Sequence, residues 1–316
     1  MLRLFYKKDG KIHKETDAEA FAGLLGEDIF WVDLHSASAE EQQAVESVFA
    51  IHFQTPQQAE EIESSSRYAE TENSLSINSN FLVVREEGYV NHPVSFILRD
   101  GLLFTSRNAD LRSFADTVRK MKTNPHQLDT GARVLVAILE TRIDLDADLI
   151  EGIARDVSTI TKTLGYEQNI REDILLRITR FQETTMLVRE NIVDKQRVVS
   201  AMLRSAHFPS DSYEKLRILI KDINSILEHA NFSFERLEYL QNTFLGLVNI
   251  EQNKIIKIFT VVSVIFMPPT LIASVYGMNF QLMPELNWAA GYPFAIGLMV
   301  ISSLGTLYLF RRKGWL

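Results

Sequence analysis

Residues 258–276 read IFTVVSVIFMPPTLIASVY, and this stretch decides the fold. No charged side chain occurs from residue 258 to 284, and none occurs again from 286 to 310. A helix of about 20 apolar residues crosses a hydrocarbon layer of about 30 Å. The sequence therefore predicts two C-terminal transmembrane helices, because buried helices of soluble proteins rarely stay uncharged over two consecutive stretches of this length.

The charge of the chain is divided unevenly between two parts. The 316 residues carry a net charge of −8, with 46% hydrophobic residues and a mean hydropathy of −0.03. Residues 255–316 hold four basic residues and one acidic residue, a charge of about +3, so the remainder carries about −11. So acidic a remainder disfavours nucleic-acid binding. The absence of cysteine excludes thiol nucleophiles, disulfides and Cys-based metal sites.

Basic residues flank the two predicted spans on the same side. They are Lys254, Lys257, Arg311, Arg312 and Lys313. The loop between the spans carries only Glu285, so the positive-inside rule places both termini in the cytoplasm and the loop outside. Aromatic residues suited to the membrane interfaces are Trp288, Tyr292, Tyr308 and Trp315. Because the N-terminus has no apolar run of signal-peptide length, we expect a multi-pass protein of the cell inner membrane whose acidic part is not exported.

The cytoplasmic part is predicted to begin with an α/β domain over residues 1–129. Strand patterns cover residues 2–6, 30–34, 75–84 and 94–98. The pair Asp100-Gly101 is a strong hairpin signal. Thr55 followed by Pro56 is typical of a helix N-terminus.

Beyond residue 130 the strand signals disappear, and three helical segments are expected. The last keeps apolar residues at i, i+3, i+4 spacing and has no proline before Pro268, so one helix should run from near Ser212 to near Tyr276. About 65 residues at 1.5 Å each give about 100 Å. The predicted fold class is thus an α+β membrane protein. After the first domain it has a long-helix region at 130–254 and a transmembrane domain at 255–316, with spans at about 256–276 and 289–310 and an outer loop at 277–288.

One face of the first span is more polar than lipid would favour. Steps of four and three residues along the helix select eight positions, of which seven are polar or Met. This polar seam consists of Asn249, Asn253, Ile256, Thr260, Ser263, Met267, Thr270 and Ser274. Packing between helices would explain the seam, because Ser and Thr are common at membrane helix contacts. A water-filled pathway would also explain it, but two spans cannot enclose a pore, so a pathway requires a homo-oligomer.

Two prolines lie within the first span, at Pro268 and Pro269. Each removes a backbone donor, and a carbonyl freed at membrane depth needs a neighbouring group, a water molecule or an ion as its partner. The prolines are therefore interpreted either as simple kink points or, together with Met267, as a hinge or constriction.

The first span ends in a distinctive sequence. Tyr276-Gly277-Met278-Asn279-Phe280 is followed by Met283-Pro284-Glu285-Leu286 and then by the second span. In this position, after a long helix, the sequence closely resembles the CorA family of magnesium channels. The resemblance is most specific from about residue 249 to 316, and over the first 200 residues it is one of organisation.

This resemblance implies a homopentamer with a large cytoplasmic funnel, in which the first span of each subunit lines one central pore and the second span packs outside it. It implies an outer selectivity ring at Gly277, Met278 and Asn279, next to Tyr276, and it fits Asn253, Met267 and Thr270 as pore-facing residues. The implied cargo is Mg²⁺, with Co²⁺ and Ni²⁺ as further candidates. A related branch exports zinc and shares a Gly-x-Asn motif, but the MPEL loop favours the magnesium branch.

The chemistry of the motif suits a hydrated ion. Mg²⁺ holds six oxygens and gives up water reluctantly, so neutral acceptors on Gly277 and Asn279 would bind its water shell without trapping it. Glu285 in the outer loop would raise the local cation concentration, or it is merely solvated.

Acidic residues of the cytoplasmic part are candidate regulatory Mg²⁺ sites, on weaker sequence evidence than the pore residues. Glu140, Asp144, Asp148 and Glu151 form an acidic stripe on one predicted helical face. Mg²⁺ bound there would stabilise a closed assembly, as the resemblance suggests, while a solvated helix face is the alternative. Glu86, Glu87 and Asp222 are further candidate sensors.

Several activities are disfavoured by what the sequence lacks. It contains no Gly-x-Gly fingerprint and no Walker-type sequence, and its seven histidines form no i, i+4 pair, so neither an enzyme nor a nucleotide-driven pump is predicted. Three hypotheses stay open: a magnesium channel, a zinc exporter of the related branch, and a non-transporting membrane-anchored sensor.

Overall fold

The structure is a computed structural model that describes residues 1–16, 28–54, 67–86, 88–166, 172–279 and 283–314. It contains two compact units, Met1–Gln241 and Asn242–Leu316. The helix N-terminus predicted at Thr55 and Pro56 lies outside the described residues, as does Glu87. The boundaries predicted at residues 129 and 254 stay predictions.

The described chain contains the following elements in order. They are β1 (Leu2–Lys8), β2 (Lys11–Glu15), β3 (Asp28–His35), α2 (Ala39–Phe49), β4 (Tyr68–Glu70), β5 (Ser74–Arg85), β6 (Gly88–Arg99), β7 (Leu102–Arg107), α5 (Arg112–Thr123), η1 (Pro125–Gln127), α6 (Gly131–Tyr166), α7 (Glu172–Met202), α8 (Ser210–Tyr276), η2 (Pro284–Asn287) and α9 (Gly291–Arg312). All four strands predicted from the sequence are present, and α6, α7 and α8 match the three helical segments.

The strands form one sheet in the order β2-β1-β3-β7-β6-β5-β4. Neighbouring strands are antiparallel except β3 and β7, which run parallel. The predicted hairpin at Asp100-Gly101 joins β6 to β7, and positive φ angles of 50° and 81° at these two residues match a tight two-residue turn. Asp9-Gly10 makes the same kind of turn between β1 and β2, with φ angles of 53° and 72°.

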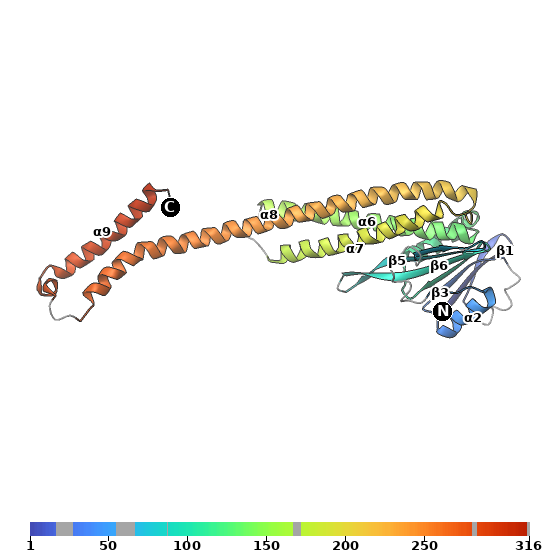
Figure 1. The fold of residues 1–316 in the computed structure, drawn as a ribbon, viewed down its shortest axis with the longest axis horizontal. Helices are drawn as coiled ribbons and strands as arrows, with labels where there is room; N and C mark the ends of the chain where they lie inside the picture. The colour runs from blue at the N-terminus through green and yellow to red at the C-terminus, as the bar shows by residue number, and fades with distance from the viewer. Residues whose placement is uncertain (17–27, 55–66, 87, 167–171, 280–282, 315–316) are drawn as a thin grey trace. The chain divides into compact units, whose positions relative to one another are not determined.

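Helices cover both faces of the sheet (Figure 1). On one face α2 packs through Phe49, whose ring centre lies 4.9 Å from that of Phe104 on β7. A capping box starts α2, because the backbone N–H of Glu41 donates to Ser38 Oγ at 3.1 Å and that of Ser38 donates to Glu41 Oε2 at 2.9 Å. On the other face, Trp31 of β3 contacts Phe114 of α5, and α6 and α7 follow beside it. The alternation of apolar residues along β3 and β7 supplies both cores.

The second unit contains the apolar end of α8 and the helix α9. Both helices have windows long and apolar enough to cross a membrane, and 0% and 6% of the residues in these windows are buried. Buried core helices of a soluble protein would be covered instead, so that alternative is disfavoured. The prediction of one continuous helix from near Ser212 to near Tyr276 is confirmed by α8.

Candidate ion pathway

The polar seam lies on the side of α8 that faces away from α9. At about 100° per residue, its positions from Asn253 to Ser274 share one side, and all of them are exposed in the single chain. Within residues 251–275 of α8, the half-buried residues lie on the opposite side. They are Val261, Val264, Ile265, Pro268, Pro269 and Ile272. Packing against the second helix of the same chain therefore does not account for the seam.

Hydroxyl groups of the seam bond to their own helix. Thr260 Oγ1 donates to the carbonyl of Ile256 at 2.8 Å, and Thr270 Oγ1 donates to that of Phe266 at 2.7 Å. Each bond uses the hydroxyl proton and leaves the oxygen lone pairs as acceptors. The exposed side of the helix thus presents acceptor oxygens, which suit the donor protons of water around a cation.

The second helix supplies a partner for a carbonyl freed by proline. Pro269 has no backbone N–H, so the carbonyl of Ile265, four residues earlier, loses its helical partner. Ser303 Oγ of α9 donates to this carbonyl at 3.2 Å. The sequence requires some partner for the freed carbonyl, and the structure identifies it as a side chain of the neighbouring helix. α8 stays helical through both prolines.

Replacing Ser303 should loosen the contact between α8 and α9. We expect Ser303→Ala to lower the stability of the full-length protein by about 1 kcal/mol, because a carbonyl in an apolar environment loses its donor. Ser302→Ala is the matched control, since Ser302 Oγ donates to Met299 within its own helix. Thermal unfolding in detergent measures both variants, and equal losses would contradict the assignment.

The Gly-Met-Asn sequence begins directly after the last residue of α8, Tyr276. The helix tightens as it ends, with Gly277 N–H donating to Ala273 O at 2.9 Å and Met278 N–H donating to Val275 O at 3.3 Å. Gly277, Met278 and Asn279 are exposed, and Tyr276 is half-buried. The carbonyl end of a helix carries partial negative charge, which favours cations near this sequence.

The chain passes from η2 into α9 through a tightly packed turn. Glu285 lies exposed in η2, and its carbonyl is so close to Gly291 that a Cβ at that glycine would overlap with the carbonyl oxygen. Only glycine fits at this position without movement of the backbone. The ring of Trp288 then contacts that of Phe294 at 5.8 Å between centres, which anchors the start of α9.

The four acidic residues of the predicted regulatory stripe are exposed on α6, and they line three different hollows. Asp144 and Glu151 line one of about 660 Å³ together with Asp222 of α8, Asp148 lines a second, and Glu140 lines a third. Burial raises the pKa of Asp144, and repulsion from Asp222 and Asp148 adds to this, against the attraction of Lys120. Within the described residues, no group of three or more His, Cys, Asp or Glu side chains is arranged to hold a metal ion.

Comparison with known proteins identifies the family. A family model described as "CorA-like Mg2+ transporter protein" matches residues 26–312. The chain is a member of the CorA family. The magnesium transport protein CorA of Wolinella succinogenes is 36% identical over 321 residues, covering 100% of both chains. That of Salmonella typhimurium is 37% identical over 293 residues, covering 92% of each.

A solved structure agrees with the fold of this CorA chain. The complete CorA magnesium transporter from Methanocaldococcus jannaschii matches it with a TM-score of 0.81, covering 100% of this chain and 99% of that one, at 19% identity. At this identity the likeness shows the fold alone. The predicted fold class, with an α/β domain, a long helix and two C-terminal apolar helices, is thereby confirmed.

Sequence reasoning did not identify Ser303 as a functional partner of the first span. A signal for it exists, because Ser302-Ser303 is a polar pair in the middle of the second apolar stretch. The sequence alone does not decide which of the two serines reaches the other helix. In the structure Ser302 bonds within α9 and Ser303 bonds across to α8.

Proposed function

We propose that this CorA chain is the subunit of a homopentameric channel through which Mg²⁺ enters the cell down its electrochemical gradient. The observation that carries the proposal is the polar seam on the side of α8 opposite to α9. In a symmetric ring of subunits, seam side chains from Asn253 to Ser274 would face one central, water-filled pathway, and α9 would lie outside against the membrane lipid. Membership of a family of Mg²⁺ transporters supports the choice of ion.

In this proposal the Gly-Met-Asn sequence forms the outer selectivity ring. Mg²⁺ keeps its water shell, and the amide oxygen of Asn279 and the carbonyl of Gly277 accept hydrogen bonds from it. Neutral acceptors bind a hydrated ion weakly enough to release it. The carbonyl ends of the α8 helices and the exposed Glu285 add negative potential near the ring.

The driving force needs no nucleotide. An inside-negative potential contributes about 2.3 kcal/mol per charge per 100 mV, and about twice that for a divalent ion. The basic flanks of the two spans favour an inner-membrane protein with both termini in the cytoplasm, which places the Gly-Met-Asn sequence at the outer end of the pathway.

Exposed apolar side chains on the first-unit part of α8 support assembly with further copies of the chain. Phe232 and Tyr239 are 63% and 66% exposed, and Ile218 is 53% exposed. These positions are separated by multiples of seven residues, so they share one side of the helix. A second copy of the chain would remove this side from water.

We further propose that cytoplasmic Mg²⁺ stabilises the closed assembly by neutralising carboxylates in the hollow between α6 and α8. Asp144 and Asp222 face each other there from two helices with their charges in conflict, as the raised pKa of Asp144 indicates. Carboxylate oxygens are ligands that Mg²⁺ accepts directly or through water. A ligand that binds only the assembled state stabilises it by mass action.

The variant Asp144→Asn should reduce the Mg²⁺-dependent rise in thermal stability of the full-length protein. Without Mg²⁺ at neutral pH it should be more stable than the original chain, because it removes a repelled carboxylate. That gain should vanish as the pH falls below the ordinary pKa of aspartate. Asp144 is then protonated in both the folded and the unfolded chain, so its carboxylate is no longer repelled in the folded state. Asp156→Asn, an exposed position on the same helix, is the control, and an equal loss of Mg²⁺ response there would contradict the site.

Ion flux into proteoliposomes tests the proposal against its alternatives. We expect Mg²⁺ uptake that follows the membrane potential and is unaffected by a proton gradient, with Co²⁺ and Ni²⁺ as further permeant ions. Zn²⁺ transport that depends on the proton gradient would favour the zinc exporter instead. Absence of flux for every ion, with the protein inserted and assembled, would favour the membrane-anchored sensor.

A further inference from the structure

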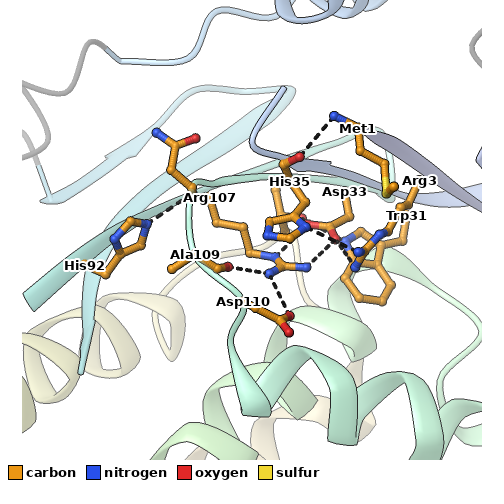
Figure 2. A network of polar contacts seen from close by, with 11 residues as sticks. Met1, Arg3, Trp31, Asp33, His35, His92, Arg107, Ala109 and Asp110 are labelled. Atoms are coloured by element: carbon orange, nitrogen blue, oxygen red, sulfur yellow. Dashed lines mark hydrogen bonds and ion pairs between the residues drawn. The ribbon is translucent and has the colours of Figure 1, made fainter. Parts of the chain in front are cut away.

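A small hollow lies against α5 where the parallel strands β3 and β7 end. Figure 2 shows the polar contacts of Arg3, Asp33 and Arg107, three of the residues that line it. Its volume is about 200 Å³, and we call it the β3/β7 hollow. Three cationic side chains line it, from Arg3, Lys14 and Arg107, together with the carboxylates of Asp33 and Asp110. The rings of Phe5, Trp31 and Phe114 form its apolar wall. In open parallel α/β sheets, ligands commonly bind at the carboxyl ends of the strands, and β3 and β7 form one such parallel pair.

The Asp33 carboxylate forms a buried ion pair with Arg107. Arg107 Nε donates to Asp33 Oδ1 at 3.1 Å and its NH2 donates to Oδ2 at 2.9 Å, while Thr105 Oγ1 donates to Oδ1 at 2.9 Å. All three residues are buried. The third guanidinium nitrogen of Arg107 donates to Ala109 O at 2.6 Å. The two bonds between Arg107 and Asp33 pair their charges, so the Asp33 carboxylate can neutralise little of the charge of another cation.

Two cations of the hollow are left poorly compensated. Arg3 reaches Asp33 only at 3.7 Å and contacts His35 Nδ1 at 3.2 Å, and its buried Nε has no hydrogen-bond partner. For the Lys14 ammonium, no hydrogen bond or ion pair occurs with the described part of the chain. Asp110 lies at the rim, with its side chain 87% exposed and 3.9 Å from Arg107. Water therefore screens that carboxylate.

The electrostatic state of the neighbouring groups agrees with a surplus of positive charge. Burial lowers the pKa of Lys14, and repulsion from Arg3 and Lys122 lowers it further, against a weaker attraction to Asp33. The pKa of His35 is lowered by burial and by Arg107 and Arg3, against Asp33 and Asp110. His92 also has its pKa lowered by burial, Arg85 and Arg107. Every one of these shifts disfavours further protonation near the hollow.

We propose that the β3/β7 hollow binds the phosphate group of a small soluble phosphate compound between Arg3 and Lys14. The two cationic side chains match the double charge of a phosphate, and the guanidinium of Arg3 and the ammonium of Lys14 can each donate a charge-assisted hydrogen bond to its oxygens. The site is distinct from the proposed ion pathway, because it lies in the first unit and shares no residue with the polar seam.

Inorganic phosphate is the probe that tests the site, and Trp31 is the reporter. The chain has three tryptophans, so Trp288→Phe with Trp315→Phe leaves Trp31 as the single emitter in the full-length protein. We expect a saturable change of its fluorescence with phosphate, and none with chloride at equal ionic strength. Lys14→Gln should weaken phosphate binding about tenfold or more, through loss of a charge-assisted bond. Calorimetric titration of the unaltered chain gives the same affinity independently.

The control variant is Lys11→Gln, on the same strand and three residues away, which does not line the hollow. Unchanged phosphate affinity in Lys11→Gln together with the loss in Lys14→Gln supports the proposal. Equal affinities in the two variants, or no saturable response to phosphate in the unaltered chain, overturn it. Because Lys14 and Lys11 are both exposed, both variants should fold.

Discussion

Asn279→Ala should abolish Mg²⁺ uptake into proteoliposomes while the protein still inserts and assembles. Asn279 lies three residues after the end of α8 and is exposed, so replacing it should disturb little packing within the described part of the chain. In the proposed ring, each subunit contributes one amide oxygen to the water shell of the ion. Alanine removes all of these acceptors at once, and we expect the flux to fall to about the level of empty vesicles.

A matched variant separates the role of the ring from that of the loop. Asn287→Ala removes the same chemical group from an exposed position of η2, outside the Gly-Met-Asn sequence, and should leave uptake nearly unchanged. Size-exclusion chromatography in detergent verifies the assembly of both variants. Mg²⁺ flux through Asn279→Ala at the original rate would refute the selectivity ring, and equal losses in both variants would assign the effect to the loop as a whole.

Asp146→Ala should be the most destabilising single change in the first unit, costing about 3–5 kcal/mol. Asp146 of α6 and Lys195 of α7 both have completely buried side chains, and Lys195 Nζ lies 3.5 Å from Asp146 Oδ2. Arg142, one turn earlier on α6, also pairs with Asp146. Alanine leaves both cations buried without this partner, and the remaining ligands of Lys195 and Arg142 are neutral carbonyls.

Those carbonyls explain why the buried cluster of Asp146, Arg142 and Lys195 is important for the fold. Lys195 Nζ donates to Asn80 O at 2.9 Å, and Arg142 NH1 donates to Leu82 O at 3.0 Å. Both acceptors belong to β5, and the ring of Phe81 lies between them under both cations. Asp146 therefore holds two helices to the same strand. Burial lowers the pKa of Lys195, and only the nearby carboxylates and its hydrogen bond oppose this.

Urea unfolding of the full-length protein carrying Trp288→Phe and Trp315→Phe, followed by the fluorescence of buried Trp31, measures the effect. Asp156→Ala on the exposed side of α6 should cost less than about 0.5 kcal/mol. Adding Lys195→Met to Asp146→Ala should restore part of the loss, because one unpaired buried charge is removed. A loss for Asp146→Ala no larger than that for Asp156→Ala would show that the cluster contributes little.

The four strand patterns and the hairpin signal at Asp100-Gly101 account for five of the seven described strands, and β2 and β4 were missed. β2 reads KIHKE, which has no alternation of apolar residues because it is an edge strand with mainly exposed side chains. The pair Asp9-Gly10 before it is the same turn signal as Asp100-Gly101 and could have identified it. β4 spans only three residues, Tyr68–Glu70, which is too short for any periodic pattern.

Part of the candidate ion pathway could also be predicted from the sequence, and part could not. The positions of the polar seam could be predicted, because helical periodicity depends only on spacing along the chain. Whether the seam packs against α9 could not be predicted, because this depends on how α9 folds back onto α8. The acidic stripe of α6 shows the limit most clearly: its spacing is regular, yet neighbouring helices and strands divide Asp144, Asp148 and Glu140 among separate hollows.

The sequence by itself determined the two apolar spans, the long helix that enters the first of them, and the Gly-Met-Asn sequence at its end. These features follow from charge, length and periodicity, which are local properties of the chain. Only the tertiary structure decided that Ser303 satisfies the carbonyl freed by Pro269, and that Arg107 pairs with Asp33 from 74 residues away. The physical reason is that partners distant in sequence meet only when packing fixes the distance and direction of both groups.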